Sequence, residues 1–505
     1  REDMKLLSLE SLKRIFAANL ESLAQTLEAD EASIQDQLLS RIVTILLGNF
    51  WDRDRAYCER VLDALVGHIL DQMQRDRGHA TSMGLFYALF ALGETFRAVY
   101  NALLLRLVKG MREKLPPHDT ALCKLLLEVP ILPQKEVVFF LKDMIVTSAM
   151  DREGDEEALE WATLGLNTLR DLVFERPSLR RACMNLSLAC AMHTNQGLRA
   201  KAIKLVANTL YPVAYLQGDI EQFALKALRQ LTTAREGSSK SLSTAEVSRH
   251  MELFFALCTK KHDLLHELLS MFARASQTQK QVMNQNVSSL AKRIPPTSPS
   301  VVGVVEAPPP GSEILLLLML HSMAEEASAL PKQLVRAIQR LYRKTGDARF
   351  LVPVFADLPK AEAVEILPKF VELPETARRT AIANAYKEGP EGRSAGNSLS
   401  ASELFVRLHL IDEAKTGIPL KKLIECTTLC FKMSDIFTPK VLSMAIQQLV
   451  QYTPLPKLFM RTVIQTSKAA PQLKGFIVGL LGRLVEKRIW EDVRQWQGFL
   501  MCAKS

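Results

Sequence analysis

Apolar residues recur every three or four positions along most of the chain, which is the period of an amphipathic helix. One such stripe, with spacings of four, four, three and four, consists of Leu12, Phe16, Leu20, Leu23 and Leu27. Near the other end, two parallel rows would bury a broad helix face: Phe476, Leu480 and Leu484 beside Ile477, Leu481 and Val485. Sustained apolar–polar alternation bounded by turn pairs is missing from the sequence. The pattern predicts an all-α protein.

Signals for helix starts agree with this prediction. Two pairs have capping-box spacing, in which each side chain satisfies an orphan backbone donor: Ser243 with Glu246, and Ser400 with Glu403. Two further starts place proline at the first helical position: Thr438-Pro439 and Ala470-Pro471.

Prolines divide the C-terminal third into segments of helical length: Pro331, Pro353, Pro359, Pro368, Pro374 and Pro390. Helices of roughly 12–17 residues between such stops would pair into hairpins with a repeat of about 30–40 residues. Hairpins that cannot each bury their apolar face must stack, which predicts a HEAT-like α-solenoid. A single helical bundle is the alternative fold, but the sequence pattern predicts too many helices to share one hydrophobic core.

Three segments interrupt the helical pattern. Residues 236–241 form a short polar loop, residues 294–313 contain six prolines with room for a short helix at 299–306, and residues 388–400 form a glycine-containing loop. We therefore predict a helical-repeat solenoid over 1–236, helices with polar and Pro-rich connectors over 237–311, and a basic helical module over 312–505. Residues 1–293 and 312–505 are expected to be separable.

Composition excludes several classes. Apolar residues make up 48% of the 505 residues, which is ample for a buried core. Apolar runs such as Ile314 to Leu320 are far short of the ~20 residues that cross a bilayer, so we expect no membrane contact.

Charge is unevenly distributed. Residues 331–505 hold 27 basic and 16 acidic residues, whereas residues 1–330 have a net charge of −2. A basic excess of this kind fits an acidic protein partner, an RNA phosphate backbone or simply a solvated face.

Catalytic and metal-binding motifs are incomplete. His262 and His266 would lie on one helix face, but the sequence supplies neither a glutamate after the first histidine nor a third ligand. Two cysteine pairs lie in apolar segments, where cysteine packs as a small hydrophobic residue: Cys426 with Cys430, and Cys183 with Cys190. The sequence contains no Cys-x-x-Cys motif. This usage indicates a reduced compartment.

The glycines of the last apolar helix do not form a phosphate-binding loop. Gly475, Gly479 and Gly482 lie within one helical segment rather than in a turn between strand and helix, so we expect them to let a neighbouring helix approach. The sequence therefore predicts an interaction scaffold, without catalytic residues, cofactor or metal.

Several stretches resemble the symplekin family. The longest is Pro454-Leu455-Pro456-Lys457-Leu458-Phe459-Met460-Arg461-Thr462-Val463-Ile464-Gln465, which is similar to the family's C-terminal domain. Shorter matches to that domain are Phe350-Leu351-Val352-Pro353, Gly396-Asn397-Ser398, and Gly475-Phe476 leading to Trp490. Residues 168–178, which read TLRDLVFERPS, resemble the family's central part.

The resemblance implies a non-enzymatic nuclear scaffold of pre-mRNA 3'-end cleavage and polyadenylation. Its implied partners are the endonuclease of the cleavage and polyadenylation specificity factor, that nuclease's inactive partner subunit, and a cleavage stimulation factor subunit. Two alternatives remain open: an unrelated helical-repeat adaptor, and a solenoid that contacts RNA through its basic C-terminal third. The fourth hypothesis, an enzyme, has the least support in the sequence.

If the resemblance holds, the nuclease pair should bind mainly within 312–505. The predicted partner-binding residues are Lys421, Lys422, Pro454, Pro456, Arg461, Gln465 and Trp490. Arg461 and Trp490 are the candidate anchors, because arginine and tryptophan are enriched at binding hot spots. The alternative is that Trp490 packs only in the solenoid core and that Arg461 is solvated.

Overall fold

The computed structural model describes residues 55–73, 78–150, 156–233, 243–327, 329–387 and 399–504. Within these ranges every regular element is a helix, which confirms the all-α prediction. The predicted stripe from Leu12 to Leu27 and the loops at 236–241 and 388–398 lie outside the described residues. None of the described helices combines the length and the apolar character needed to cross a membrane.

The chain divides into two compact units, residues 1–227 and 228–505, with the boundary inside α11. The described helices of the first unit, together with the boundary helix, are α3 (Arg55–Met73), α4 (Gly78–Ala91), η1 (Glu94–Phe96), α5 (Arg97–Lys114), α6 (Ala121–Glu128), α7 (Gln134–Met150), α8 (Glu156–Glu175), α9 (Arg180–Cys190), α10 (Gln196–Leu205), η2 (Val206–Leu210) and α11 (Ala214–Thr233).

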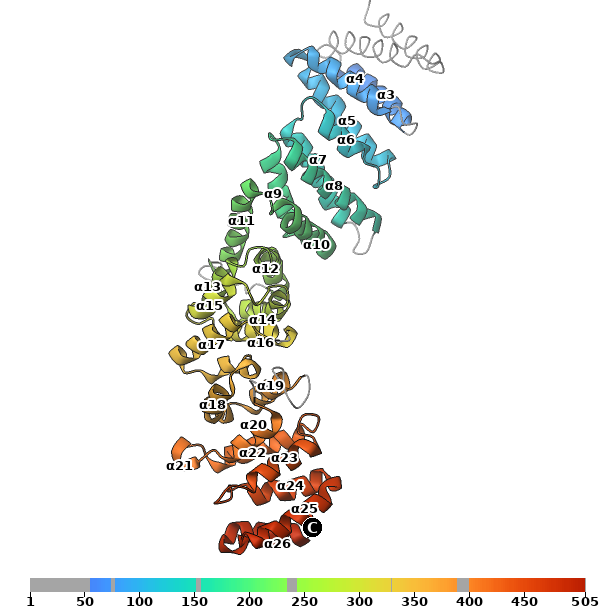
Figure 1. The fold of residues 1–505 in the computed structure, drawn as a ribbon. Coiled ribbons are helices and arrows are strands. Elements are labelled where there is room, and N and C mark those ends of the chain that lie inside the picture. The colour runs from blue at the N-terminus through green and yellow to red at the C-terminus, as the bar shows by residue number, and fades with distance from the viewer. Residues whose placement is uncertain are drawn as a thin grey trace, which may run out of the picture. The chain divides into compact units, whose positions relative to one another are not determined.

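In the first unit, most helices pack on near neighbours in the chain, as a repeat protein requires. Helix α8 is central, because it packs against α6, α7, α9 and α10 (Figure 1). Gly165 on α8 permits a close approach to α7, since a Cβ there would collide with the side chain of Ile145.

The helices of the second unit run from α12 to the C-terminal end. They are α12 (Thr244–Cys258), α13 (Leu264–Arg274), α14 (Gln277–Ala291), α15 (Pro299–Glu306), α16 (Glu313–Glu326), α17 (Lys332–Thr345), η3 (Ala348–Leu351), η4 (Phe355–Asp357), α18 (Lys360–Glu372), α19 (Glu375–Ala385), α20 (Ala401–His409), α21 (Glu413–Thr416), α22 (Leu420–Lys432), α23 (Pro439–Leu449), α24 (Phe459–Ala469), η5 (Pro471–Leu473), α25 (Lys474–Glu486), η6 (Ile489–Glu491) and α26 (Val493–Lys504).

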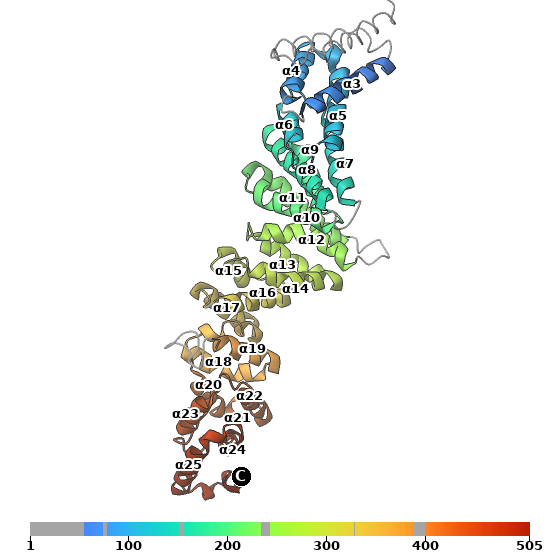
Figure 2. The same ribbon diagram turned by 90° about the vertical axis from the view of Figure 1, so that its right-hand side faces the viewer.

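Alternate helices of the second unit stack on one another. Helix α14 packs between α12 and α16, α15 packs between α13 and α17, and α24 packs against α22 and α26 (Figures 1 and 2). Two layers of helices stacked in chain order are the arrangement of a helical-repeat solenoid, as predicted.

The helix starts predicted from the sequence are confirmed where the structure describes them. Both capping boxes form: the Ser243 and Ser400 side chains accept from the backbone N–H of the glutamate three residues on. Thr438 caps α23, with Pro439 at its first position. Pro471 begins a short 3₁₀ turn, η5, that leads into α25.

Prolines mark most of the predicted helix ends, with one correction. Pro331, Pro359 and Pro374 each directly precede a helix, because proline tolerates the position where the backbone N–H is unpaired. Pro368 instead lies inside α18, so the prediction that it separates two helices was wrong.

The Pro-rich stretch 294–313 contains the predicted short helix at 299–306. It lies within the second compact unit, where α15 packs against α13 and α17. The three-part division of the sequence, and the separability of 1–293 from 312–505, stay predictions.

Candidate interaction surfaces

The seven predicted partner-binding residues occupy three places in the second unit. Lys421 and Lys422 lie in the first turn of α22. Pro454 and Pro456 precede α24, and Arg461 and Gln465 lie on it, whereas Trp490 belongs to η6. Within the described residues, no hydrogen bond or ion pair joins any two of the seven.

The segment around Pro456 is held by the last helix of the unit. The buried side chain of Gln495 on α26 donates through Nε2 to the Pro456 carbonyl at 2.9 Å and accepts from the Met460 N–H at 3.3 Å. Gly498 permits this contact, because a Cβ there would lie 2.6 Å from the Met460 Cβ. The motif at 454–465 is therefore fixed in place by α26.

Helix α24 presents Arg461 to solvent while its next residue faces the core. Thr462 is buried and is hydrogen bonded through Oγ1 to Nε2 of His409, at 2.6 Å. His409 also makes a 2.7 Å bond through Nδ1 to the Phe405 carbonyl, and complete burial lowers its pKa to about 4. The neutral imidazole thus fixes the rotation of α24 that points Arg461 outward.

Gln465 is less exposed than Arg461, the other predicted partner-binding residue on α24. It lies one turn after Arg461 and is half-buried, and its Oε1 atom is buried without a hydrogen-bond partner among the described residues. Its side chain is therefore less accessible to a partner protein than that of Arg461.

Several lysine side chains lie near the start of α22. Lys421 is exposed, Lys422 lies 3.9 Å from Glu425, and Lys457 pairs with Glu413 of α21 at 3.1 Å. The last pair brings the segment before α24 next to α21. Such exposed pairs add little stability.

Trp490 is 47% exposed, so it does not pack only in the solenoid core. Other apolar side chains exposed in this C-terminal part are Val478, Val485, Val493, Leu500 and Met501. A tryptophan among exposed aliphatic side chains suits a protein–protein contact.

The predicted role of the α25 glycines was wrong. A Cβ added at Gly475, Gly479 or Gly482 would meet no atom within 4 Å, so none of the described helices approaches them closely. The close approach occurs at Gly498 instead. The predicted double row is buried only in part: Ile477, Leu480 and Leu484 are buried, but Val485 is exposed.

The histidine and cysteine patterns do not assemble a metal site. His262 lies in the turn before α13 and bonds through Nδ1 to Ser298 at 2.8 Å, so the prediction that it shares a helix face with His266 was wrong. The described residues contain no cluster of three or more potential metal ligands. Cys183 and Cys190 are buried, and burial raises the pKa of each thiol to about 12.

A buried arginine, which the sequence reasoning missed, lies beside the second cysteine pair. Arg378 is 2% exposed; it donates to the Val371 carbonyl at 3.2 Å and lies 3.8 Å from Glu425. Burial raises the pKa of Cys426 to about 11 and that of Cys430 well above its usual value. Both cysteines therefore pack as core residues, as predicted.

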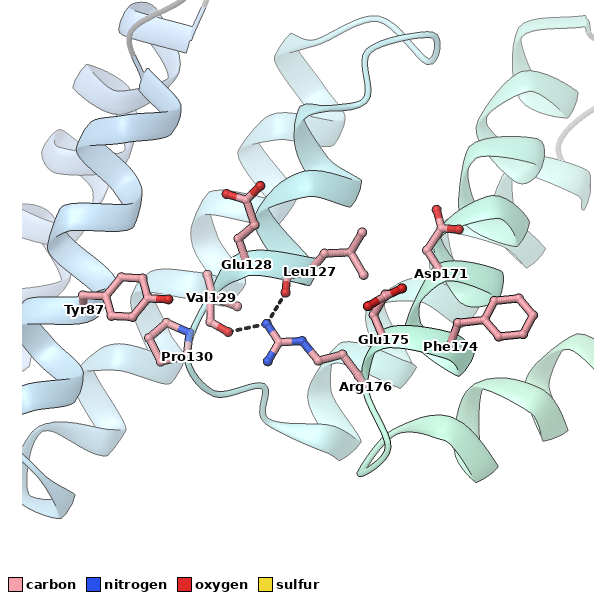
Figure 3. Close-up of a pocket in the computed structure, with 9 residues that line it drawn as sticks. All are labelled: Tyr87, Leu127, Glu128, Val129, Pro130, Asp171, Phe174, Glu175 and Arg176. Carbon is pink, nitrogen blue, oxygen red and sulfur yellow. Dashed lines mark hydrogen bonds between the residues drawn. The ribbon is translucent and has the colours of Figure 1, made fainter. Parts of the chain in front are cut away.

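The stretch 168–178 builds a pocket in the first unit (Figure 3). Arg176, just after α8, donates to the carbonyl oxygens of Leu127 and Val129 at the end of α6. A guanidinium at that position satisfies unpaired carbonyls and complements the helix dipole. The arginine of this motif therefore stabilises the junction of α6 with α8.

The cavity measures about 730 Å³ and three carboxylates line it. Glu128 is bonded to His79 at 2.7 Å, and Asp171 to Arg170 at 2.7 Å. Glu175 is the one lining carboxylate for which the described residues supply no partner. The charge of this pocket is thus largely balanced within the chain.

These surfaces and the stacked layers define a helical-repeat protein with solvent-facing side chains suited to partner binding. Residues 347–505 match the family model described as symplekin tight junction protein C terminal. This part of the chain is therefore similar to the C-terminal part of the symplekin family, which confirms the resemblance over residues 347–505. The matched residues include all seven predicted partner-binding positions.

Proposed function

We propose that the chain is a non-enzymatic scaffold of the nuclear machinery that cleaves and polyadenylates pre-mRNA. The observation that supports this most directly is the match of residues 347–505 to the symplekin C-terminal family. The solenoid fold is compatible with the role, since stacked helices present long surfaces to several partners at once.

In this proposal, residues 312–505 hold the endonuclease of the cleavage and polyadenylation specificity factor together with its inactive partner subunit. A cleavage stimulation factor subunit is a further partner. Arg461 and Trp490 act as anchors because both are exposed and combine a large contact area with a polar group. Lys421 and Lys422 steer association, since charges at an interface rim mainly raise the association rate.

Affinity purification of the chain from nuclear extract, followed by mass spectrometry, tests the class of function. The expected result is recovery of the nuclease pair with polyadenylation factors. Recovery of transport cargo without those factors would overturn the proposal.

Three variants then test the surface in quantitative pull-downs of the nuclease pair. Arg461→Ala and Trp490→Ala should each weaken binding at least fivefold, whereas Lys421→Glu/Lys422→Glu should slow association and reduce its salt dependence. Arg379→Ala on α19 is the matched control, because Arg379 is also an exposed arginine in the same unit. Normal binding by a folded Arg461→Ala protein would remove Arg461 as an anchor.

A further inference from the structure

Helix α17 has two faces of opposite character. Its buried side consists of Leu334, Val335, Ala337, Ile338 and Leu341. Its five basic residues, all exposed, are Lys332, Arg336, Arg340, Arg343 and Lys344, here called the α17 basic stripe. At 100° per residue the stripe spans an arc of about 120°, opposite the buried side. Burial of the apolar face therefore directs all five cations outward.

Most of the stripe has no counter-charge. Arg340 pairs with Glu306 of α15 at 2.9 Å, and within the described residues the other four members form no ion pair. Helix α17 itself contains no acidic residue. On α18, in contrast, Lys360 pairs with Glu403 and Lys369 with Glu372.

Two carboxylates lie near the N-terminal half of the stripe. Asp357 and Glu362 line a cavity of about 440 Å³ that is also lined by Lys332 and Arg336. Asp357 accepts from the Leu330 N–H at 3.3 Å, and Glu362 accepts from Gln339. Near the C-terminal end, the Asp347 carboxylate accepts hydrogen bonds from Nε and Nη2 of Arg349. Arg349 balances the charge of Asp347, so the five cations of the stripe outnumber the three other carboxylates near it, Glu306, Asp357 and Glu362.

We propose that the α17 basic stripe binds the phosphate backbone of single-stranded RNA. A packed protein interface requires an apolar centre, but the exposed positions of α17 hold only polar side chains. Three of the five cations are arginines, whose planar guanidinium groups match phosphate geometry. From Lys332 to Lys344 the stripe extends about 18 Å, which is enough for several successive phosphates.

This inference goes beyond the scaffold function, and the two can fail separately. RNA binding is measured with the purified chain alone, whereas the scaffold role is measured by the proteins recovered from extract. Neither result depends on the other.

The test is fluorescence anisotropy of a labelled oligouridylate, titrated with the full chain at several KCl concentrations. Each phosphate contact contributes about −0.7 to the slope of log K against log salt, so Arg336→Ala/Arg343→Ala should reduce the slope by about 1.4. At 0.1 M salt, this change in slope corresponds to roughly 25-fold weaker RNA binding by the Arg336→Ala/Arg343→Ala variant. Arg336→Lys/Arg343→Lys should retain most of the slope, because the charges remain.

The matched control is Lys360→Ala/Lys369→Ala, which removes two exposed but paired cations from the next helix. It should bind within twofold of the unmodified chain. Equal binding by the unmodified chain and the Arg336→Ala/Arg343→Ala variant would overturn the proposal. So would tighter binding of polyglutamate than of oligouridylate at equal salt, since the stripe would then suit an acidic protein segment.

Discussion

Helices α17 and α25 lie in the same unit and have nearly equal lengths of 14 and 13 residues, yet their outward faces differ. Helix α17 presents cations with no exposed apolar residue, whereas α25 presents glycines together with Val478 and Val485, which are 63% and 43% exposed. Their inward faces are alike, with fully buried leucine and isoleucine side chains.

The comparison shows which face of each helix is required by the fold and which face is free to differ. Stacking requires an apolar inward stripe on every helix, because that burial provides most of the stability of a helical repeat. The outward face is not constrained by stacking. The two proposals account for this difference, since α17 would contact a polyanion and the region of α25, η6 and α26 an apolar protein surface.

The first prediction concerns the buried contact between His409 on α20 and Thr462 on α24. The pKa of His409 is lowered from 6.5 to about 4, mainly by burial, so the folded state resists its protonation. Its stabilising contribution is complete above pH 6.5 and is lost as the pH falls toward 4. Between pH 7.5 and 5 we expect a loss of about 2 kcal/mol in the free energy of unfolding.

Urea unfolding at both pH values measures this loss, and hydrogen exchange locates it. Peptides from α24, which bears the Thr462 partner, should lose protection at pH 5 before those from α17. His68, His250 and His321 also have lowered pKa values and act in the same direction. The informative quantity is therefore the difference from His409→Gln, and identical pH dependence in both proteins would exclude His409 as the cause.

The second prediction concerns the two kinds of glycine near the C-terminal end. Gly498→Ala should destabilise the protein by about 1–3 kcal/mol, because the new Cβ would push α26 away from Met460 on α24. Gly479→Ala should instead stabilise it by about 0.5–1 kcal/mol, since its helical site is open and alanine is the better helix former. Thermal melts compare the pair, and stabilisation by both would mean that α26 does not rest on α24.

The same glycines show how far the sequence could predict the structure. Local signals were sufficient for helix type and for several starts: Ser243 with Glu246, and Ser400 with Glu403, act within one helical turn. The short helix at 299–306 was likewise predictable from local spacing. Close approach at Gly498 was not, because it depends on which residue of another helix lies opposite.

The candidate surfaces were predictable to a smaller extent. The motif at 454–465 located α24, but periodicity alone could not show that Arg461 is exposed while Thr462 bonds His409. Buried Arg378 was missed because its partner, the Val371 carbonyl, belongs to the backbone and has no sequence signature. The turn that holds His262 was also missed, since four-residue spacing suggests one helix face even when a helix begins between the two residues.

The smallest expected effect tests whether the outward face of α17 contributes to the fold. The Arg340–Glu306 pair measures 2.9 Å, but the two side chains are 63% and 41% exposed, so solvent and salt screen their attraction. Arg340→Ala should therefore change the free energy of unfolding by less than about 0.5 kcal/mol. Ile338→Ala, on the buried face of the same helix, should cost about 2–5 kcal/mol. Urea unfolding of the two variants compares the faces directly. A cost above about 1 kcal/mol for Arg340→Ala would place the outward face among the stabilising contacts, and the two faces of α17 would then no longer divide into folding and binding.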